Sequence, residues 1–201
     1  GASVHRQSLT PGLVFSWNMN KASDNDYPAD FSNSTTKTAQ RLLVRDIGLD
    51  YYGSIWSASL RSTSYQVLQD VTAPITLPYE RLPQLSFRAG QSDVFGLDWS
   101  VDASMTRFWH PTLTRGQRAV INPQLSLPFI QPAYFVVPKV SFHATSYQID
   151  NPMAGQPDRL QRTVPSFSVD SGLIFERRAS LLGNKITQTL EPRLFYVNTP
   201  F

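Results

Sequence analysis

The sequence predicts an all-β fold: an antiparallel up-and-down meander of about nine long strands, forming an arc of a large transmembrane outer-membrane β-barrel. Three observations predict it. Apolar and polar residues alternate along several long segments, short and long connections alternate between them, and no apolar stretch reaches the roughly 18–20 residues of a membrane helix. The mean hydropathy of -0.25 is compatible with this fold, because the polar face and the loops of a membrane barrel dilute its lipid face.

The alternation is clearest from Phe95 to Met105, where odd positions are apolar and even positions are polar or Gly. Successive side chains of a strand point to opposite faces, so this segment predicts a ribbon with one apolar and one polar face. The strands expected from this pattern and from the turn residues between them are 12–20, 40–52, 54–68, 82–89, 94–109, 119–129, 133–149, 162–178 and 186–198.

The connections between the expected strands alternate in length. Short connections are expected at Gly53, Gly90–Asp93, Gln131–Pro132 and Ser180–Lys185, and longer ones at Lys21–Ala39, Gln69–Arg81, His110–Arg118 and Asn151–Gln161. Tight turns at one rim and long loops at the other are typical of outer-membrane barrels. An odd number of strands does not close such a barrel, so residues 1–201 are expected to be one partial barrel domain within a longer chain.

Prolines recur in the phase of the apolar face, at Pro83, Pro123, Pro138, Pro165 and Pro192. A turn centred on Ile130–Gln131 would place Pro123 opposite Pro138 and Leu125 opposite Val136, so that the two apolar faces coincide. Proline cannot donate a hydrogen bond to the ladder. The prolines therefore mark either bulges or strand ends, and the sequence leaves both alternatives open.

The alternation assigns side chains to the two faces of the expected barrel wall. The lumen-facing candidates are Asp46, Asp50, Arg61, Asp98, Asp102, Lys139, His143, Asp170, Glu176, Glu191 and Arg193. The lipid-facing candidates are Leu97, Trp99, Val101, Met105, Leu125, Leu127, Val136, Phe167 and Leu173. The candidates for an aromatic girdle at the membrane interface are Trp109, Tyr134, Phe175 and Tyr196.

Charge and motif content argue against several classes of function. The net charge of +3 is too small to predict a nucleic-acid partner, and the absence of cysteine excludes disulfides within this sequence. The three histidines have no metal-ligand spacing, and neither a Gly-x-Ser-x-Gly elbow nor a phosphate-binding Gly loop is present. We therefore expect no enzymatic activity, no metal site and no cofactor.

Two phrases near the end of the sequence resemble a known family. They are Thr163–Asp170 followed by Leu173–Arg177, and Thr187–Phe201, in which Gln-Thr-Leu-Glu-Pro-Arg leads into an aromatic run ending in Pro-Phe. Both are similar to the barrel of LptD, the lipopolysaccharide assembly family of the outer membrane. Similar phrases also occur upstream, at Tyr65–Val67, Asn122–Pro128 and His143–Gln148.

The resemblance implies a role in inserting lipopolysaccharide into the outer leaflet of the outer membrane of a Gram-negative bacterium. It also implies contact with outer-membrane lipid, a lipoprotein plug of the LptE type in the lumen and a periplasmic bridge of the LptA type that joins regions outside this segment. The family's jelly-roll domain, its terminal barrel strands and its paired cysteines have no matching positions here. A general porin or solute-uptake barrel, or a soluble β-sandwich or glycan-binding protein, would also show the alternation, so these alternatives stay open.

Overall fold

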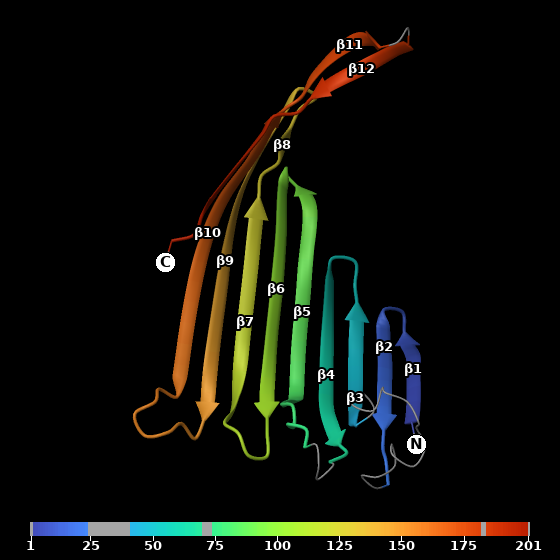
Figure 1. Ribbon diagram of the computed structural model, residues 1–201, viewed down its shortest axis with the longest axis vertical. Helices are drawn as coiled ribbons and strands as arrows, with labels where there is room; N and C mark the ends of the chain where they lie inside the picture. Colours follow the sequence, from blue (N-terminus) through green and yellow to red (C-terminus); the bar gives the residue numbers. More distant parts are fainter. Residues whose placement is uncertain (1, 24–40, 70–73, 182–183, 201) are drawn as a thin grey trace. The chain divides into compact units, whose positions relative to one another are not determined.

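The computed structural model describes residues 2–23, 41–69, 74–181 and 184–200, and these residues contain strands and no helix (Figure 1). The strands are β1 Ala2–Thr10, β2 Leu13–Asn20, β3 Leu42–Tyr52, β4 Trp56–Val67, β5 Glu80–Val94, β6 Leu97–Trp109, β7 Arg115–Ser126, β8 Phe129–Ile130, β9 Tyr134–Asp150, β10 Arg159–Leu173, β11 Phe175–Leu181, β12 Asn184–Leu190 and β13 Arg193–Asn198. Among the described residues, no helix is long and apolar enough to cross a membrane.

The strands form one large sheet and one small one. The large sheet has the order β1-β2-β3-β4-β5-β6-β7-β9-β10-β13, with β8 paired to β9, and the small sheet is the hairpin β11-β12. Neighbours in the large sheet are consecutive along the chain except where β8 and the β11-β12 hairpin intervene. The predicted antiparallel up-and-down meander is therefore confirmed.

The chain clusters into two compact units. Unit 1 comprises residues 1–88, 103–120 and 145–161, and unit 2 comprises residues 89–102, 121–144 and 162–201. Strands β1 to β4 lie in unit 1, whereas β8 and β11 to β13 lie in unit 2. The chain passes from one unit to the other within β5, β6, β7, β9 and β10.

Strand β1 was not expected from the sequence. Its residues do not alternate in polarity, because Arg6 and Ser8 occupy the phase of Val4. The strand is nevertheless paired along its length with β2, from Ala2 opposite Asn20 to Thr10 opposite Leu13. Backbone pairing with β2 thus substitutes for the polarity pattern that identifies the other strands.

The tight turn between β5 and β6 lies further along the chain than expected. The prediction of a turn at Gly90–Asp93 is wrong, because β5 continues to Val94 and the turn residues are Phe95 and Gly96, with φ of 54° and 82°. Positive φ at both central residues is the signature of a type I′ hairpin turn. Gly90 is needed inside the strand, because a Cβ there would lie 3.0 Å from the carbonyl oxygen of Trp99.

The expected register around Ile130 is also wrong. Phe129 pairs with Val136 and Ile130 with Phe135, and the Gln131 N–H donates to the Tyr134 carbonyl over 2.8 Å. The turn is therefore centred on Pro132–Ala133 instead of Ile130–Gln131, and Val136 does not face Leu125. Because the displacement is an even number of residues, the apolar faces of the two strands still coincide.

The last two expected strands, 162–178 and 186–198, are each interrupted. Strand β10 ends at Leu173 and β11 begins at Phe175, while Glu191 and Pro192 separate β12 from β13. At this break the Ile174 N–H donates to the Ala133 carbonyl and the Leu173 N–H to the Pro192 carbonyl. The missed β1, the short β8 and these two interruptions explain why more strands are present than the nine expected.

The strand-end alternative holds for one of the five prolines. Pro83, Pro123, Pro138 and Pro165 lie inside strands, and Pro192 lies in the break between β12 and β13. The proline carbonyls remain available to the ladder, as the bond from the Leu127 N–H to the Pro138 carbonyl at 3.0 Å shows. The predicted long connections Lys21–Ala39 and Gln69–Arg81 fall partly outside the described residues, at 24–40 and 70–73.

The described residues contain almost no apolar core. Ala22, Leu68 and Ala89 are the buried hydrophobic residues among them, whereas large apolar side chains on most strands are exposed. A sheet normally buries one face against another layer. Here the apolar side chains of the sheet lack a protein layer to cover them within the part of the chain that the structure describes.

Candidate functional site

Four of the long strands carry an apolar band of similar length. In β6 it consists of Leu97, Trp99, Val101, Ala103 and Met105, and the next position in the same phase is Arg107. From Leu97 to Met105 a strand rises about 27 Å. At the tilt of about 40° found in membrane barrels, the band is about 20 Å tall, close to the apolar height of such barrels.

Three other strands carry a similar band. It spans 119–127 along and just beyond β7, where Phe129 continues its phase, 136–144 in β9 and 165–173 in β10, where Ser171 interrupts it. Pro123, Pro138 and Pro165 belong to these bands, and so do the lipid-facing candidates. Of those candidates, Met105, Leu125, Phe167 and Leu173 are exposed, while Leu97, Trp99, Val101, Leu127 and Val136 are half-buried.

The opposite phase of these strands is polar. In β6 it carries Asp98, Ser100, Asp102, Ser104 and Thr106. We call this the polar face and the other the apolar face. The stacking of Trp56 on Phe87, with ring centroids 6.1 Å apart, shows that the apolar faces of β4 and β5 lie on the same side.

An ion-pair network occupies the polar face of β3 and β4. Arg61 donates to Asp46 at 2.7 Å and to Asp50 at 3.1 Å. The register explains the contact, because Gly48 lies opposite Arg61 and between the two aspartates. The Thr63 hydroxyl also donates to Asp46 at 2.7 Å, and the Ser59 hydroxyl donates to Asp50 at 2.6 Å. Three lumen-facing candidates are thus brought together.

A second ion pair joins β10 and β13. Arg193 donates to both carboxylate oxygens of Asp170, with its Nε at 2.7 Å from Oδ1. Gly172, opposite Arg193, has no side chain, and the Phe135 ring occupies the space where its Cβ would lie. Two more lumen-facing candidates therefore meet in a bidentate pair, which is the strong geometry for Arg and carboxylate.

The remaining lumen-facing candidates are dispersed. Asp98 accepts the backbone N–H of Asp93 at 2.8 Å beside the β5-β6 turn. Asp102, Lys139 and His143 lie in the polar phase of β6 and β9. Glu176 lies in β11, outside the large sheet, and Glu191 lies in the break before β13.

The four aromatic-girdle candidates lie near strand ends or in a short strand. Trp109 ends β6, Tyr134 begins β9, Phe175 begins β11, and Tyr196 lies within β13. All four are exposed. Trp109 also contacts the Arg115 guanidinium, which lies 5.1 Å from the centre of its ring.

His110 has a structural role that the sequence did not indicate. Its imidazole is buried, and its Nδ1 accepts the backbone N–H groups of Thr112 at 3.1 Å and Leu113 at 2.9 Å. Because Nδ1 accepts, Nε2 carries the hydrogen and donates to the Leu77 carbonyl at 3.2 Å. The imidazole thereby fixes the β6-β7 loop and attaches it to the segment before β5.

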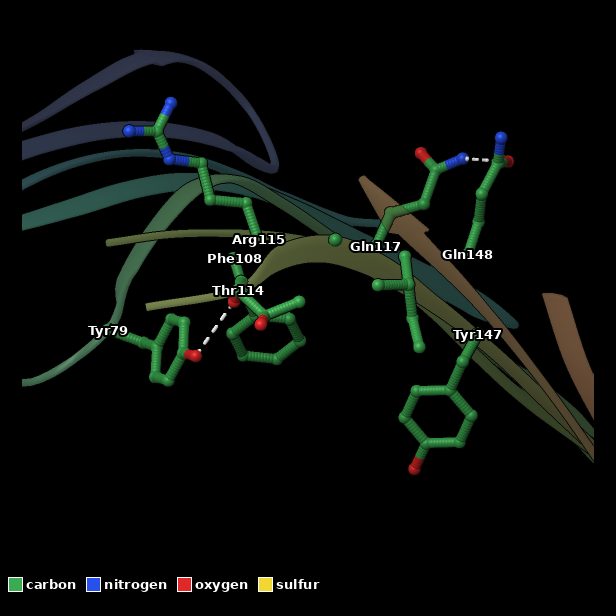
Figure 2. Close-up of a pocket in the computed structure, with 9 residues that line it drawn as sticks. Tyr79, Phe108, Thr114, Arg115, Gln117, Tyr147 and Gln148 are labelled. Carbon is green, nitrogen blue, oxygen red and sulfur yellow. Dashed lines mark hydrogen bonds between the residues drawn. The ribbon is translucent and has the colours of Figure 1, made fainter. Parts of the chain in front are cut away.

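A hollow of about 230 Å³ lies next to this loop. Figure 2 shows Tyr79, Phe108 and Tyr147 on one side of the ribbon, and Arg115, Gln117 and Gln148 on the other. At Gly116 two backbones come close, because a Cβ there would meet the Gln148 carbonyl oxygen at 2.5 Å. Phe108 shares the phase of Asp102, and Tyr147 shares that of His143, so the rings belong to the polar face.

The side of the ribbon opposite the rings is hydrophilic beyond the apolar band. Arg107 pairs with Asp150 at 2.7 Å, and Gln117 donates to Gln148 at 2.8 Å. These four residues continue the phase of the apolar face. The apolar band therefore ends before the long connections begin.

A single layer of long antiparallel strands, each with an apolar band on one face and polar groups on the other, defines a transmembrane β-barrel segment. Comparison with known sequences identifies the family. The family model described as "LptD: LPS transport system D" matches residues 2–200. The chain belongs to this family.

Individual relatives agree with the family model. The chain is 45% identical over 204 residues to a protein of Polaromonas sp., 45% identical over 195 residues to one of Albidiferax ferrireducens, and 43% identical over 209 residues to one of Azoarcus sp.. Each of these is named LPS-assembly protein LptD. The alignments cover 96%, 94% and 100% of this chain but 25%, 24% and 26% of the relatives, so the chain spans about a quarter of their length.

Proposed function

We propose that this chain forms part of the barrel wall through which lipopolysaccharide is inserted into the outer leaflet of the outer membrane. The observation that carries the proposal is the apolar band on β6, β7, β9 and β10, backed by a polar face. The names of the relatives supply the substrate class. An amphipathic glycolipid needs such a wall, because its sugars stay among polar groups while its acyl chains reach lipid.

In this proposal the apolar face contacts outer-membrane lipid and the polar face lines the lumen. The Arg61 network and the Arg193–Asp170 pair then hold neighbouring strands together on the water-filled side. Charges on this side are also available to a plug of the LptE type, which the family resemblance implies. A bridge of the LptA type would act through parts of the protein outside this chain.

The assignment of the faces is tested with single cysteines in the full-length protein. Val101→Cys should react with a membrane-confined maleimide and be protected from a water-soluble one, because Val101 lies in the middle of the apolar band. Ser100→Cys, the adjacent residue on the polar face, is the matched control and should show the reverse. Equal reaction of both cysteines with the water-soluble reagent would contradict a membrane-spanning sheet.

The function itself is tested by depletion of the full-length protein. Newly made lipopolysaccharide should stop reaching the cell surface and accumulate inside, whereas depletion of a general porin should not have this effect. If surface lipopolysaccharide were unchanged while uptake of small solutes fell, the porin alternative would replace the proposal.

A further inference from the structure

We propose that Phe108 and Tyr147, which line the hollow over Gly116, form with the neighbouring Arg118 a binding site for an acidic sugar: a pyranose ring that carries a phosphate or a carboxylate. The inference rests on the proposed function, because it requires the polar face to line the lumen. It goes further in naming a place on the wall and the chemistry of the sugar held there.

The strand register brings the three side chains together. Gln117 bonds to Gln148, and a Cβ on Gly116 would lie 3.3 Å from the Ile149 Cα. In an antiparallel pair this places Arg118 opposite Tyr147. On its other side, the Arg118 guanidinium lies over the Phe108 ring, with Cζ 5.4 Å from the ring centre. Arg118 therefore lies between an aromatic residue of β6 and one of β9.

Arg118 differs from three other arginines of the sheet in its partners. Arg61, Arg107 and Arg193 each pair with an aspartate. The Nε of Arg118 is buried without a hydrogen-bond partner among the described residues. A guanidinium on an aromatic face keeps its fork of donors in one plane, suited to a phosphate or a carboxylate. An anionic group at its terminal nitrogens would give Arg118 the charged partner that those three arginines have.

The Phe108 ring beside Arg118 is held in place before any ligand arrives. The Tyr79 hydroxyl donates to the Thr114 carbonyl at 2.7 Å, as Figure 2 shows. The Tyr79 ring also packs edge-on against Phe108, with centroids 6.2 Å apart, and 5.1 Å from the His110 ring. Because His110 fixes the loop, the rings lose little freedom when a ligand binds.

The size and the lining of the hollow fit one sugar ring. Its volume of about 230 Å³ is below the roughly 300–1,000 Å³ of sites for drug-sized ligands. Aromatic rings stack on the C–H face of a pyranose, and Ile149 and Gly116 supply the rest of an apolar floor. A sugar stacked there would direct an acidic substituent toward Arg118.

The experiment uses the full-length protein in its complex, with a small diazirine amino acid in place of Ile149, an apolar residue of the floor of the hollow. The probe is purified lipopolysaccharide with phosphorylated core sugars. A second diazirine at Ser104, on the polar face of β6, reports lipopolysaccharide in the lumen away from the hollow. We expect crosslinks at both positions.

Arg118→Gln should lower the crosslink yield at position 149 about tenfold or more while leaving the yield at position 104 unchanged, as expected for loss of a charge-assisted contact. Enzymatically dephosphorylated lipopolysaccharide should crosslink weakly at position 149 if phosphate is the anion, and normally if a carboxylate is. Arg107→Gln, which removes an arginine on the other face, is the matched control and should change neither yield. Arg118→Lys should retain part of the yield, because it keeps the charge but not the planar fork of donors.

Each opposite result overturns the site. An unchanged yield at position 149 in Arg118→Gln, or equal losses in the Gln and Lys variants, would show that the charge does not bind the sugar. Phospholipid in place of lipopolysaccharide at position 149 would assign the hollow to a lipid headgroup. Loss of crosslinks at position 104 as well, in the unmodified sequence, would instead count against the proposed function.

Discussion

Replacing Val101 with Arg should destabilise the folded protein by about 2–4 kcal/mol, because Val101 lies at the centre of the apolar band of β6. The band extends about 13 Å along the strand on either side of Val101. After correction for strand tilt, Leu97 and Met105 lie about 10 Å from the midplane of the band. The same substitution at either end should therefore cost about 0–1 kcal/mol.

The expected profile has a maximum in the middle of β6 and falls toward both ends. It is measured by refolding full-length protein into phosphatidylcholine vesicles and following the folded form, by its mobility on unheated gels, as urea is increased. Ser100→Arg, one residue from Val101 but on the polar face, should change the free energy of unfolding by less than about 1 kcal/mol. Equal costs at positions 100 and 101, or a flat profile along the band, would refute the assignment of the faces.

Three further substitutions test the contacts between strands. Arg61→Ala should lower the free energy of unfolding by about 1–2 kcal/mol in the same urea assay. This value is reduced for solvent screening because the Arg61 side chain is 39% exposed. Adding Asp46→Asn to Arg61→Ala should lower the free energy of unfolding little further. Gly172→Val should lower the yield of folded protein severalfold, because the Phe135 ring fills the space of the new side chain, whereas Gly172→Ala in a Phe135→Ala background should recover it. His110→Ala should speed amide hydrogen exchange in the loop after β6 about tenfold or more, since two N–H groups lose their acceptor; unchanged exchange in that loop would contradict the role of the imidazole.

The polarity pattern predicted the long central strands because the two faces of each differ in chemistry. From Leu97 to Met105 the odd and even positions alternate without exception, and β6 covers that whole segment. Strand β1 was not predicted because Arg6 and Ser8 break the alternation. Its backbone pairing with β2 does not depend on the polarity of its residues.

A polarity pattern shows which face of the sheet a residue lies on, but it does not show how far one strand is shifted along its neighbour. Sliding one strand past its neighbour by an even number of residues keeps both apolar faces aligned, which is why the register around Pro132 was wrong while the faces were right. The position of that turn depends on the bond from Gln131 to Tyr134. The polarity pattern does not predict that bond.

The aromatic hollow could not be predicted from the sequence, because its parts come from three strands and two connecting segments. Phe108, Arg118 and Tyr147 meet only once the registers of β6, β7 and β9 are known. One signal was nevertheless present, since Phe108 is an aromatic residue in a polar phase. Gly116 gave no signal, because the sequence placed it in the connection His110–Arg118, whereas the structure places it in β7.

The similar apolar bands make the fit to the membrane independent of the length of the strands. Strands β6, β7, β9 and β10 have 13, 12, 17 and 15 residues, yet their apolar bands have similar lengths. The bacterial outer membrane is thinner than average, and a short band avoids the cost of hydrophobic mismatch. Residues added in pairs at a strand end would extend the wall into water without disturbing either that match or the phase of the faces.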